Sequence, residues 1–189
     1  AMTSDYPLKE YGFHSAAAVH LMAEAERRAY ADRAEHLGDP DFWKVPIKKL
    51  TDAAYLKSRM SDFQAEKATP SAKTTAGKFK ESEETTHFSI VDAWGNAVSV
   101  TTTLNDSYGS RTVVSGGGFI LNNEMDDFSA KPGAPNLYGA VGGKANAIAP
   151  NKRPLSSMTP VIATKGGKTW LVVGTPGGTT IPTSVFQVI

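Results

Sequence analysis

The chain has 189 residues, no cysteine and a formal net charge of +1. The lack of cysteine excludes disulfides, thiolate metal sites and cysteine catalysis, and the balanced charge gives no electrostatic reason to bind nucleic acid or an anionic membrane. No run approaches ~18 consecutive apolar residues, so no membrane span is expected. The length suits one domain, or one domain with an appended piece.

Composition divides the chain near residue 85. Residues 1–84 hold 13 Lys/Arg and 14 Asp/Glu but three glycines, whereas residues 85–189 hold 7 Lys/Arg, 5 Asp/Glu and 14 glycines. The first part therefore indicates helices followed by a solvated linker, and the second indicates strands joined by tight turns. Together they predict an α+β protein, with helices first and antiparallel strands after them.

The first part contains one long predicted helix, from about Ser15 to His36. Ser15 suits the N-cap position, and Gly38 followed by Pro40 stops the helix. Its apolar residues lie at helical spacing along one stripe: Ala18, Leu21, Met22, Ala25 and Ala29.

A second, shorter helix is predicted from Asp52 to Phe63, with Thr51 as its N-cap. The helical region is thus assigned to residues 1–64. Residues 65–84 contain few large apolar side chains and many Lys, Thr, Ser and Glu residues, so we expect them to form a mobile linker.

The second part, residues 85–189, begins with alternating side chains that predict a hairpin around Trp94-Gly95-Asn96. A short strand is expected at residues 119–121, and residues 136–154 are predicted to be loop. A second hairpin is predicted from residues 161–164 and 169–173, and a helix from Pro182 onward. The three glycines at 116–118 indicate a turn and not a phosphate-binding loop, because no Lys-Ser/Thr pair follows them.

Thr85 stands between the predicted linker and the first predicted strand. If the peptide bond between Glu84 and Thr85 is cleaved, Thr85 carries a hydroxyl nucleophile and a free α-amine on one residue. Because an α-amine has a pKa of about 7.7–8.0, it can act as the general base for that hydroxyl. The sequence therefore predicts acyl-transfer chemistry that depends on processing at this bond.

Four segments carry a family resemblance: TTHFS at 85–89, LNNEMDDF at 121–128, PNKRPLSSM at 150–158 and PGG at 176–178. In this order they closely resemble gamma-glutamyltranspeptidase, of the N-terminal-nucleophile hydrolases. Upstream, DYP at 5–7, ADR at 31–33 and GDPDF at 38–42 look like the end of that family's large subunit. The resemblance implies an αββα sandwich. This chain would supply part of it, from the end of the large subunit into the first part of the small one.

The resemblance also assigns roles residue by residue. Thr85 matches the nucleophile exposed by autocleavage after Glu84, and Thr103 matches a threonine that hydrogen-bonds it. The remaining matches hold the substrate or the oxyanion: Asn105, Glu124 and Asp127 for the α-amino group, Ser156 and Ser157 for the α-carboxylate, and Gly177 and Gly178 for the oxyanion hole. The family's main α-carboxylate anchor is an arginine further upstream, which neither Arg111 nor Arg153 matches.

Taken singly, these residues have simpler interpretations. Thr85 could be an ordinary β-branched residue that opens a strand, Asp126 and Asp127 could cap a turn, and Ser156-Ser157 could be polar loop residues. His87 lies close to Thr85 in sequence but is predicted to be structural and not the base. It is the ordered set of motifs that favours the enzyme.

The function implied is gamma-glutamyl transfer or hydrolysis, with glutathione or a related compound as donor. Water, an amino acid or a peptide would accept the acyl group, and no organic cofactor or metal would be needed.

The remaining parts of both subunits are implied as partners of this chain. Self-association is expected through uncovered sheet edges, and the family resemblance suggests a periplasmic or secreted location. Related acylases, poly-γ-glutamate hydrolases and a silent, uncleaved fragment remain alternatives. Ala1-Met2 is interpreted as a cloning remnant, and we expect this chain alone to be inactive.

Overall fold

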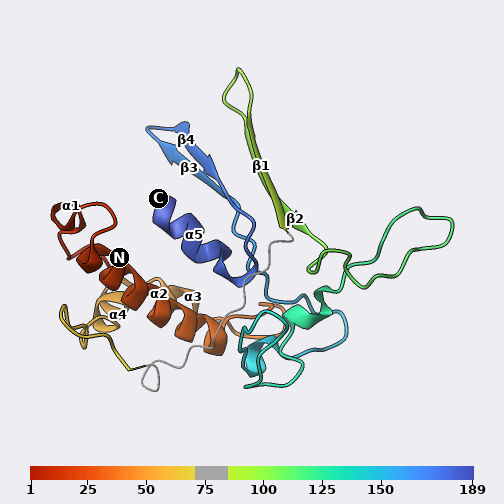
Figure 1. The fold of residues 1–189 in the computed structure, drawn as a ribbon, viewed down its shortest axis with the longest axis horizontal. Coiled ribbons are helices and arrows are strands. Elements are labelled where there is room, and N and C mark those ends of the chain that lie inside the picture. The colour runs from red at the N-terminus through yellow and green to blue at the C-terminus, as the bar shows by residue number, and fades with distance from the viewer. Residues whose placement is uncertain (71–84) are drawn as a thin grey trace.

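The computed structural model describes residues 1–70 and 85–189 (Figure 1). Helices precede residue 70, and two β-hairpins, short 3-10 turns and a last helix follow residue 85. The helices are α1 (Leu8–Tyr11), α2 (Ala16–His36), α3 (Ile47–Leu50), α4 (Ala53–Ser58) and α5 (Ile181–Val188), and the 3-10 turns are η1 (Glu124–Asp127), η2 (Lys144–Asn146) and η3 (Gly178–Thr180). Within these residues no helix has the length and apolarity to cross a membrane.

Helix α2 confirms the predicted long helix. Ser15 is its N-cap, and the Ser15 hydroxyl accepts a hydrogen bond from the Ala18 N–H at 3.1 Å. Its buried stripe includes Leu21, which has no exposed surface and packs against Met60 in the helical core. Just past the helix end, Gly38 passes so close to the loop at Ala145 that an added Cβ would lie 2.2 Å from a carbonyl oxygen.

Helix α4 is shorter than predicted, and its cap is different. Asp52 is the N-cap and accepts a hydrogen bond from the Tyr55 N–H at 2.8 Å. Thr51 cannot serve, because its hydroxyl donates to the Ile47 carbonyl at 2.9 Å and so closes α3. The prediction of a helix from Asp52 to Phe63 capped by Thr51 is therefore wrong in cap and length. Beyond Arg59 the backbone continues as turns.

A buried ion pair fastens the segment after α4 to α2. Glu24 and Arg28 are each almost fully buried, and their side chains meet at 2.5 Å. Arg28 also binds Asp62 at 2.7 Å, and Glu24 accepts the Thr69 N–H at 3.0 Å. The first residues of the predicted linker thus contact α2 at Thr69. Residues 71–84, including Glu84, lie outside the described residues, so the mobility of the linker stays a prediction.

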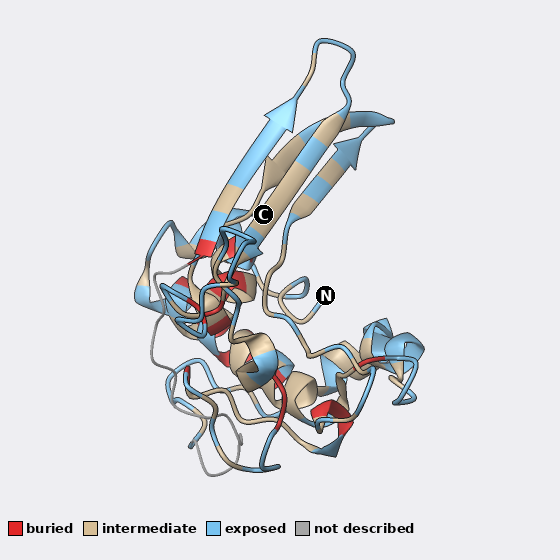
Figure 2. Cartoon of the chain, turned by 90° about the vertical axis from the view of Figure 1, so that its right-hand side faces the viewer, coloured by how far each residue is buried: buried red, intermediate tan, exposed pale blue. Residues whose placement is uncertain are grey.

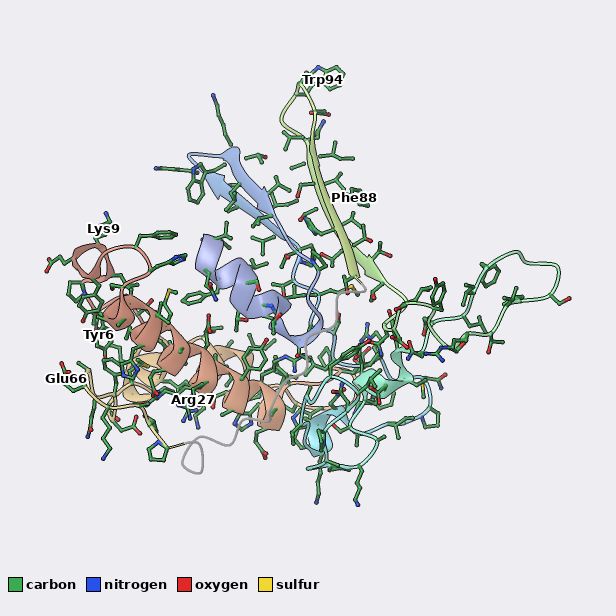
Figure 3. All side chains as sticks on the ribbon, in the orientation of Figure 1. Tyr6, Lys9, Arg27, Glu66, Phe88 and Trp94 are labelled. Carbon is green, nitrogen blue, oxygen red and sulfur yellow. The ribbon has the colours of Figure 1, made fainter. Side chains whose placement is uncertain are left out.

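The first predicted hairpin is confirmed as strands β1 (Thr85–Val91) and β2 (Ala97–Thr103). They pair antiparallel with Thr85 opposite Thr103. Asp92 organises the turn, since its carboxylate accepts the N–H groups of Trp94 and Asn96, both at 2.9 Å. Trp94 stands at the tip, pointing away from the protein (Figure 3).

The second hairpin, β3 (Val161–Lys165) with β4 (Lys168–Val173), is confirmed as well. It forms a separate two-stranded sheet beside the first hairpin. Side-chain hydrogen bonds join the two, because Ser99 Oγ donates to the Val173 carbonyl at 3.3 Å and Thr169 Oγ1 donates to the Gly95 carbonyl at 3.1 Å. Both hairpins are largely exposed or half-buried along their length, whereas buried residues gather at their base (Figure 2).

The strand predicted at residues 119–121 is wrong. In its place, Val113 and Ile120 form an isolated antiparallel bridge around a turn, and no strand extends from it. Gly116 and Gly118 have φ angles of 75° and 70°, a backbone conformation that favours glycine and bends the chain too tightly for a longer ladder. The turn predicted at residues 116–118 is confirmed.

Helix α5 confirms the helix predicted near the end of the sequence, and its buried residues Ile181 and Val185 face the interior. The turn η3 that leads into α5 is joined to α2, because the Tyr30 hydroxyl donates a hydrogen bond to the Thr179 carbonyl. One region therefore brings together the base of both hairpins, the start of α5 and the second half of α2.

Candidate active site

The two threonines singled out in the sequence face each other across the first hairpin. Thr85 begins β1 and is buried, and Thr103 ends β2 in the paired position. The Thr85 hydroxyl lies 3.4 Å from the Thr103 hydroxyl, which also accepts the Asn105 N–H at 2.9 Å. The hairpin register therefore fixes the position of one hydroxyl relative to the other.

His87 lies on the same face of β1 as Thr85, but its ring is engaged elsewhere. Its two nitrogens lie 2.8 Å from Thr101 Oγ1 and 3.0 Å from Ser89 Oγ. The ring also packs on Gly174, where an added Cβ would lie 2.3 Å from it. These contacts support the structural role predicted for this histidine.

A small pocket of about 30 Å³ opens beside the threonine pair. Seven of the predicted residues line it: Thr85, Thr103, Asn105, Asp127, Ser156, Ser157 and Gly178. Glu124 and Gly177 do not line it, although each is close in sequence to a residue that does. The fold thus gathers residues that are spread over about half of the chain.

Asn105 is held in an uncommon backbone conformation, with a φ angle of 79°. Its side-chain amide donates to the Asn123 carbonyl at 3.3 Å, and its own carbonyl accepts the Tyr138 hydroxyl. Tyr138 is buried and lines the pocket, although none of the sequence motifs includes it. The sequence feature that could have pointed to Tyr138 is its aromatic side chain within a loop dense in Gly, Asn and Pro.

Asp127 is the most perturbed carboxyl group of the site. Burial, together with the neighbouring carboxylates of Glu124 and Asp126, raises the pKa of Asp127 to about 6, against the opposing effect of Arg33. Burial also raises the pKa of Glu124. A cationic group would favour the ionised form of Asp127, so this corner of the pocket suits an ammonium ligand.

The loop that carries the two serines is fastened at Arg153, just before them, and at Ser157 itself. Arg153 binds the buried carboxylate of Asp39 through its backbone N–H at 2.9 Å and its guanidinium at 3.0 and 2.6 Å. Arg33 Nη2 donates to Ser157 Oγ at 2.8 Å. These arginine contacts could not be predicted from the sequence, because they join residues more than a hundred positions apart and no local pattern marks them.

The glycine pair forms the turn that enters η3. Gly177 and Gly178 have φ angles of 136° and 54°, which strain any residue with a Cβ. Gly178 lies at the pocket that Thr85 also lines. A backbone N–H there can approach a reacting carbonyl without obstruction from a side chain.

The chain was compared with known proteins. The family model for gamma-glutamyltranspeptidase matches residues 1–189. Among curated proteins, the chain is 57% identical over 187 residues to the glutathione hydrolase proenzyme of Escherichia coli, which covers 98% of this chain and 32% of that protein. It is 40% identical over 184 residues to the acylase ACY 1 proenzyme of a Pseudomonas species, covering 97% of this chain and 31% of the relative. The chain spans about a third of the length of these relatives.

Solved structures agree in fold. A mutant gamma-glutamyltranspeptidase of Helicobacter pylori matches with a TM-score of 0.53 and 67% identity, over 55% of each chain. The enzyme of Pseudomonas nitroreducens in complex with L-DON matches with a TM-score of 0.54 and 64% identity, over 55% of this chain and 53% of that one. The mixed arrangement of helices and antiparallel strands is thus that of the N-terminal-nucleophile hydrolases, as predicted.

Proposed function

Because the chain belongs to the gamma-glutamyltranspeptidase family, we propose that it carries the nucleophile and much of the donor pocket for gamma-glutamyl transfer or hydrolysis. The observation that supports this most directly is the contact between Thr85 and Thr103 at the edge of a pocket that Asp127 and Gly178 also line. Relatives described as proenzymes support processing before activity.

The reaction would begin once cleavage between Glu84 and Thr85 leaves a free α-amine on Thr85. The amine takes the hydroxyl proton as the oxygen attacks the γ-carbonyl of the donor, and a γ-glutamyl ester forms as the amine leaving group departs with a proton. Water then attacks the ester to release glutamate, or the amino group of an acceptor forms a new γ-amide. In both cases the Thr85 hydroxyl is regenerated.

The other pocket residues suit the charges of this substrate. Asp127 provides a carboxylate for the α-ammonium group, and the hydroxyls of Ser156 and Ser157 can donate to the α-carboxylate. Gly177 and Gly178 would provide backbone N–H donors for the developing oxyanion, each worth on the order of 3 kcal/mol. Glutathione is the donor that these charges and the similarity to glutathione hydrolases together favour. The proposed location, periplasmic or secreted, rests on the family resemblance alone.

An acylase is the second candidate, favoured by the 40% identity to the acylase proenzyme. The buried carboxyl of Asp127 separates the two, because an acyl group without an α-ammonium would offer that carboxylate no charged hydrogen-bond donor. A preference for γ-glutamyl over simple acyl donors would support the first candidate.

The first experiment is intact mass and N-terminal sequencing of the purified chain after incubation at neutral pH. We expect two fragments, the second beginning Thr-Thr-His-Phe-Ser. Thr85→Ala should remain uncut, whereas Thr85→Ser, which keeps a hydroxyl, should still be cleaved. Cleavage of Thr85→Ala at the parental rate would contradict the proposal, because the hydroxyl would then have no part in processing.

A further inference from the structure

We propose that Arg33 is a positioning residue for the donor pocket, holding Ser157 ready for the α-carboxylate and providing the positive charge that faces Asp127. This inference rests on the function proposed above and deepens it. Arg33 lies on α2, upstream of the processing site, whereas both residues it acts on lie downstream. Arg33 would therefore make α2, which precedes the processing site, part of the pocket after cleavage.

The contact with the serine loop is direct. Arg33 Nη2 lies 2.8 Å from Ser157 Oγ and 3.5 Å from the Ser156 carbonyl. A serine hydroxyl has one proton and two acceptor lone pairs. Because Arg33 donates to the oxygen, the Ser157 proton remains available for a carboxylate, and a charged donor strengthens that second hydrogen bond.

The position of the guanidinium is set by α2 itself. It lies 5.8 Å from the ring centroid of Tyr30, one helical turn earlier. The Tyr30 hydroxyl in turn donates to the carbonyl of Thr179, the residue after Gly178. One face of α2 therefore contacts both the serine loop and the turn that carries the oxyanion glycines.

Arg33 also borders a second cavity of about 130 Å³, which adjoins the first. The two cavities share three lining residues: Asp127, Ser157 and Thr179. Burial lowers the pKa of Arg33, while Tyr30 and Asp127 act to raise it. An arginine keeps its charge under such conditions, and its planar group can serve two acceptors at once, which a lysine does less well.

The charges around Asp127 make Arg33 electrostatically important. Glu124 and Asp126, on the same 3-10 turn as Asp127, both raise its pKa, and Arg33 lowers it. Loss of Arg33 should therefore raise the pKa of Asp127 further above about 6. The carboxylate form, which an ammonium group needs, would then be lost at a higher pH.

Two other titratable groups border these cavities. Tyr138 lines the smaller cavity and donates its hydroxyl to Asn105, and Lys131 lines the larger one with an exposed side chain. Besides burial, the groups that set the pKa of Asp127 are Glu124, Asp126 and Arg33. A change in the acid limb on replacing Arg33 would thus report on Arg33 itself.

The test is steady-state kinetics with a γ-glutamyl anilide on the natural full-length protein, after mass analysis has verified processing. Arg33→Met removes the charge and the donors, and Arg33→Lys keeps the charge. We expect Arg33→Met to raise KM about tenfold or more with a smaller change in kcat, since hydrogen bonds to charged groups are worth about 1.5–3 kcal/mol. In the profile of kcat/KM against pH, the acid limb of Arg33→Met should move to higher pH. Arg33→Lys should raise KM but leave the acid limb in place.

Two controls separate positioning from general damage. Arg27→Met changes another arginine of α2, which binds Glu24 and Thr69 and not the pocket, and it should leave KM and the acid limb unchanged. In a Ser157→Ala background, Arg33→Lys should have little further effect on KM, because the contact it weakens is already gone.

The possible results are distinct. If processed Arg33→Met has the same KM and the same acid limb of kcat/KM as the parent, Arg33 does not position the pocket. The proposed function would remain intact in that case. If Arg33→Met is not processed, the KM of Arg33→Lys is compared with that of the parent instead. An equal KM in the two proteins would overturn the inference. A parent protein that is processed but turns over no γ-glutamyl donor would overturn the proposed function and this inference with it.

Discussion

Replacing Glu24 with glutamine would test the buried ion pair that fastens the segment after α4 to α2. Glu24 accepts hydrogen bonds from Arg28 at 2.5 Å, from Arg27 at 3.0 Å and from the Thr69 N–H at 3.0 Å. Breaking a buried pair by removing one partner costs about 3–5 kcal/mol. Because Asp62 still binds Arg28 at 2.7 Å, we expect the lower end of that range, about 3 kcal/mol.

The assay is thermal unfolding followed by circular dichroism. For a chain of this size each kcal/mol moves Tm by about 2–4 °C, so Glu24→Gln should lower Tm by about 6–12 °C at pH 7. Glu35→Gln is the matched control, since Glu35 lies on the same helix with an exposed side chain. It should change the free energy of unfolding by less than about 0.5 kcal/mol.

The pH dependence gives a second, independent measurement. Burial by itself raises the pKa of Glu24, but hydrogen bonds from Arg28 and Thr69 outweigh it and lower the pKa to about 2 from its ordinary 4.5. A carboxyl whose pKa is lower in the folded state contributes stability above its unfolded pKa and loses it as the pH falls toward the folded value. The parent should therefore lose more stability than Glu24→Gln between pH 4.5 and 2.

Two results would contradict a stabilising ion pair. One is an equal unfolding temperature of Glu24→Gln and Glu35→Gln at pH 7, and the other is a parallel loss of stability of the parent and Glu24→Gln as the pH falls. Either result would mean that the ion pair contributes no net stability in this fold.

The remaining predictions concern the core, a close backbone contact and the site. Leu21→Ala should cost about 2–5 kcal/mol in urea unfolding, whereas Val19→Ala, which is half exposed on the same helix, should cost much less. Gly38→Ala should lower Tm, because its Cβ would lie 2.2 Å from the Ala145 carbonyl oxygen; an unchanged Tm would mean that the loop moves aside freely. Asp127→Asn should stabilise the chain at pH 7 and not at pH 3, since the pKa of this carboxyl is raised from its ordinary 3.8 to about 6 and its ionisation opposes folding increasingly between these two values. An equal change in stability at both pH values would contradict the raised pKa of Asp127.

Local patterns predicted the parts of the fold that local physics controls. Ser15 caps α2 because its hydroxyl accepts the Ala18 N–H, and apolar side chains follow at helical spacing. The hairpins formed where side chains alternate around glycine turns. Two errors arose where neighbouring residues compete or a turn intervenes. Asp52 took the cap predicted for Thr51, since both residue types favour that position, and the glycine turn at 116–118 limited residues 119–121 to a single bridge.

Most of the candidate site was also predictable, because four ordered motifs carry it. The motifs indicated which residues act together, but not how they meet. The pairing of Thr85 with Thr103 followed from strand register, which alternation constrains. Glu124 and Gly177 were predicted in the site, yet neither lines the pocket. Their proximity to it depends on turns that the pattern does not specify.

The ordered motifs of the sequence predicted the groups of the proposed chemistry: a threonine at a processing site, a glycine pair for an oxyanion, and carboxyl and hydroxyl groups for a charged amino acid. The distant side chains that support these groups came to light only in the folded chain. Arg33 reaches Ser157 across 124 positions, and Tyr138 reaches Asn105 across 33. Such contacts depend on how α2 and the loops pack, and packing depends on the whole chain at once. The same holds for the raised pKa of Asp127, since burial is a property of the folded state and not of the residue.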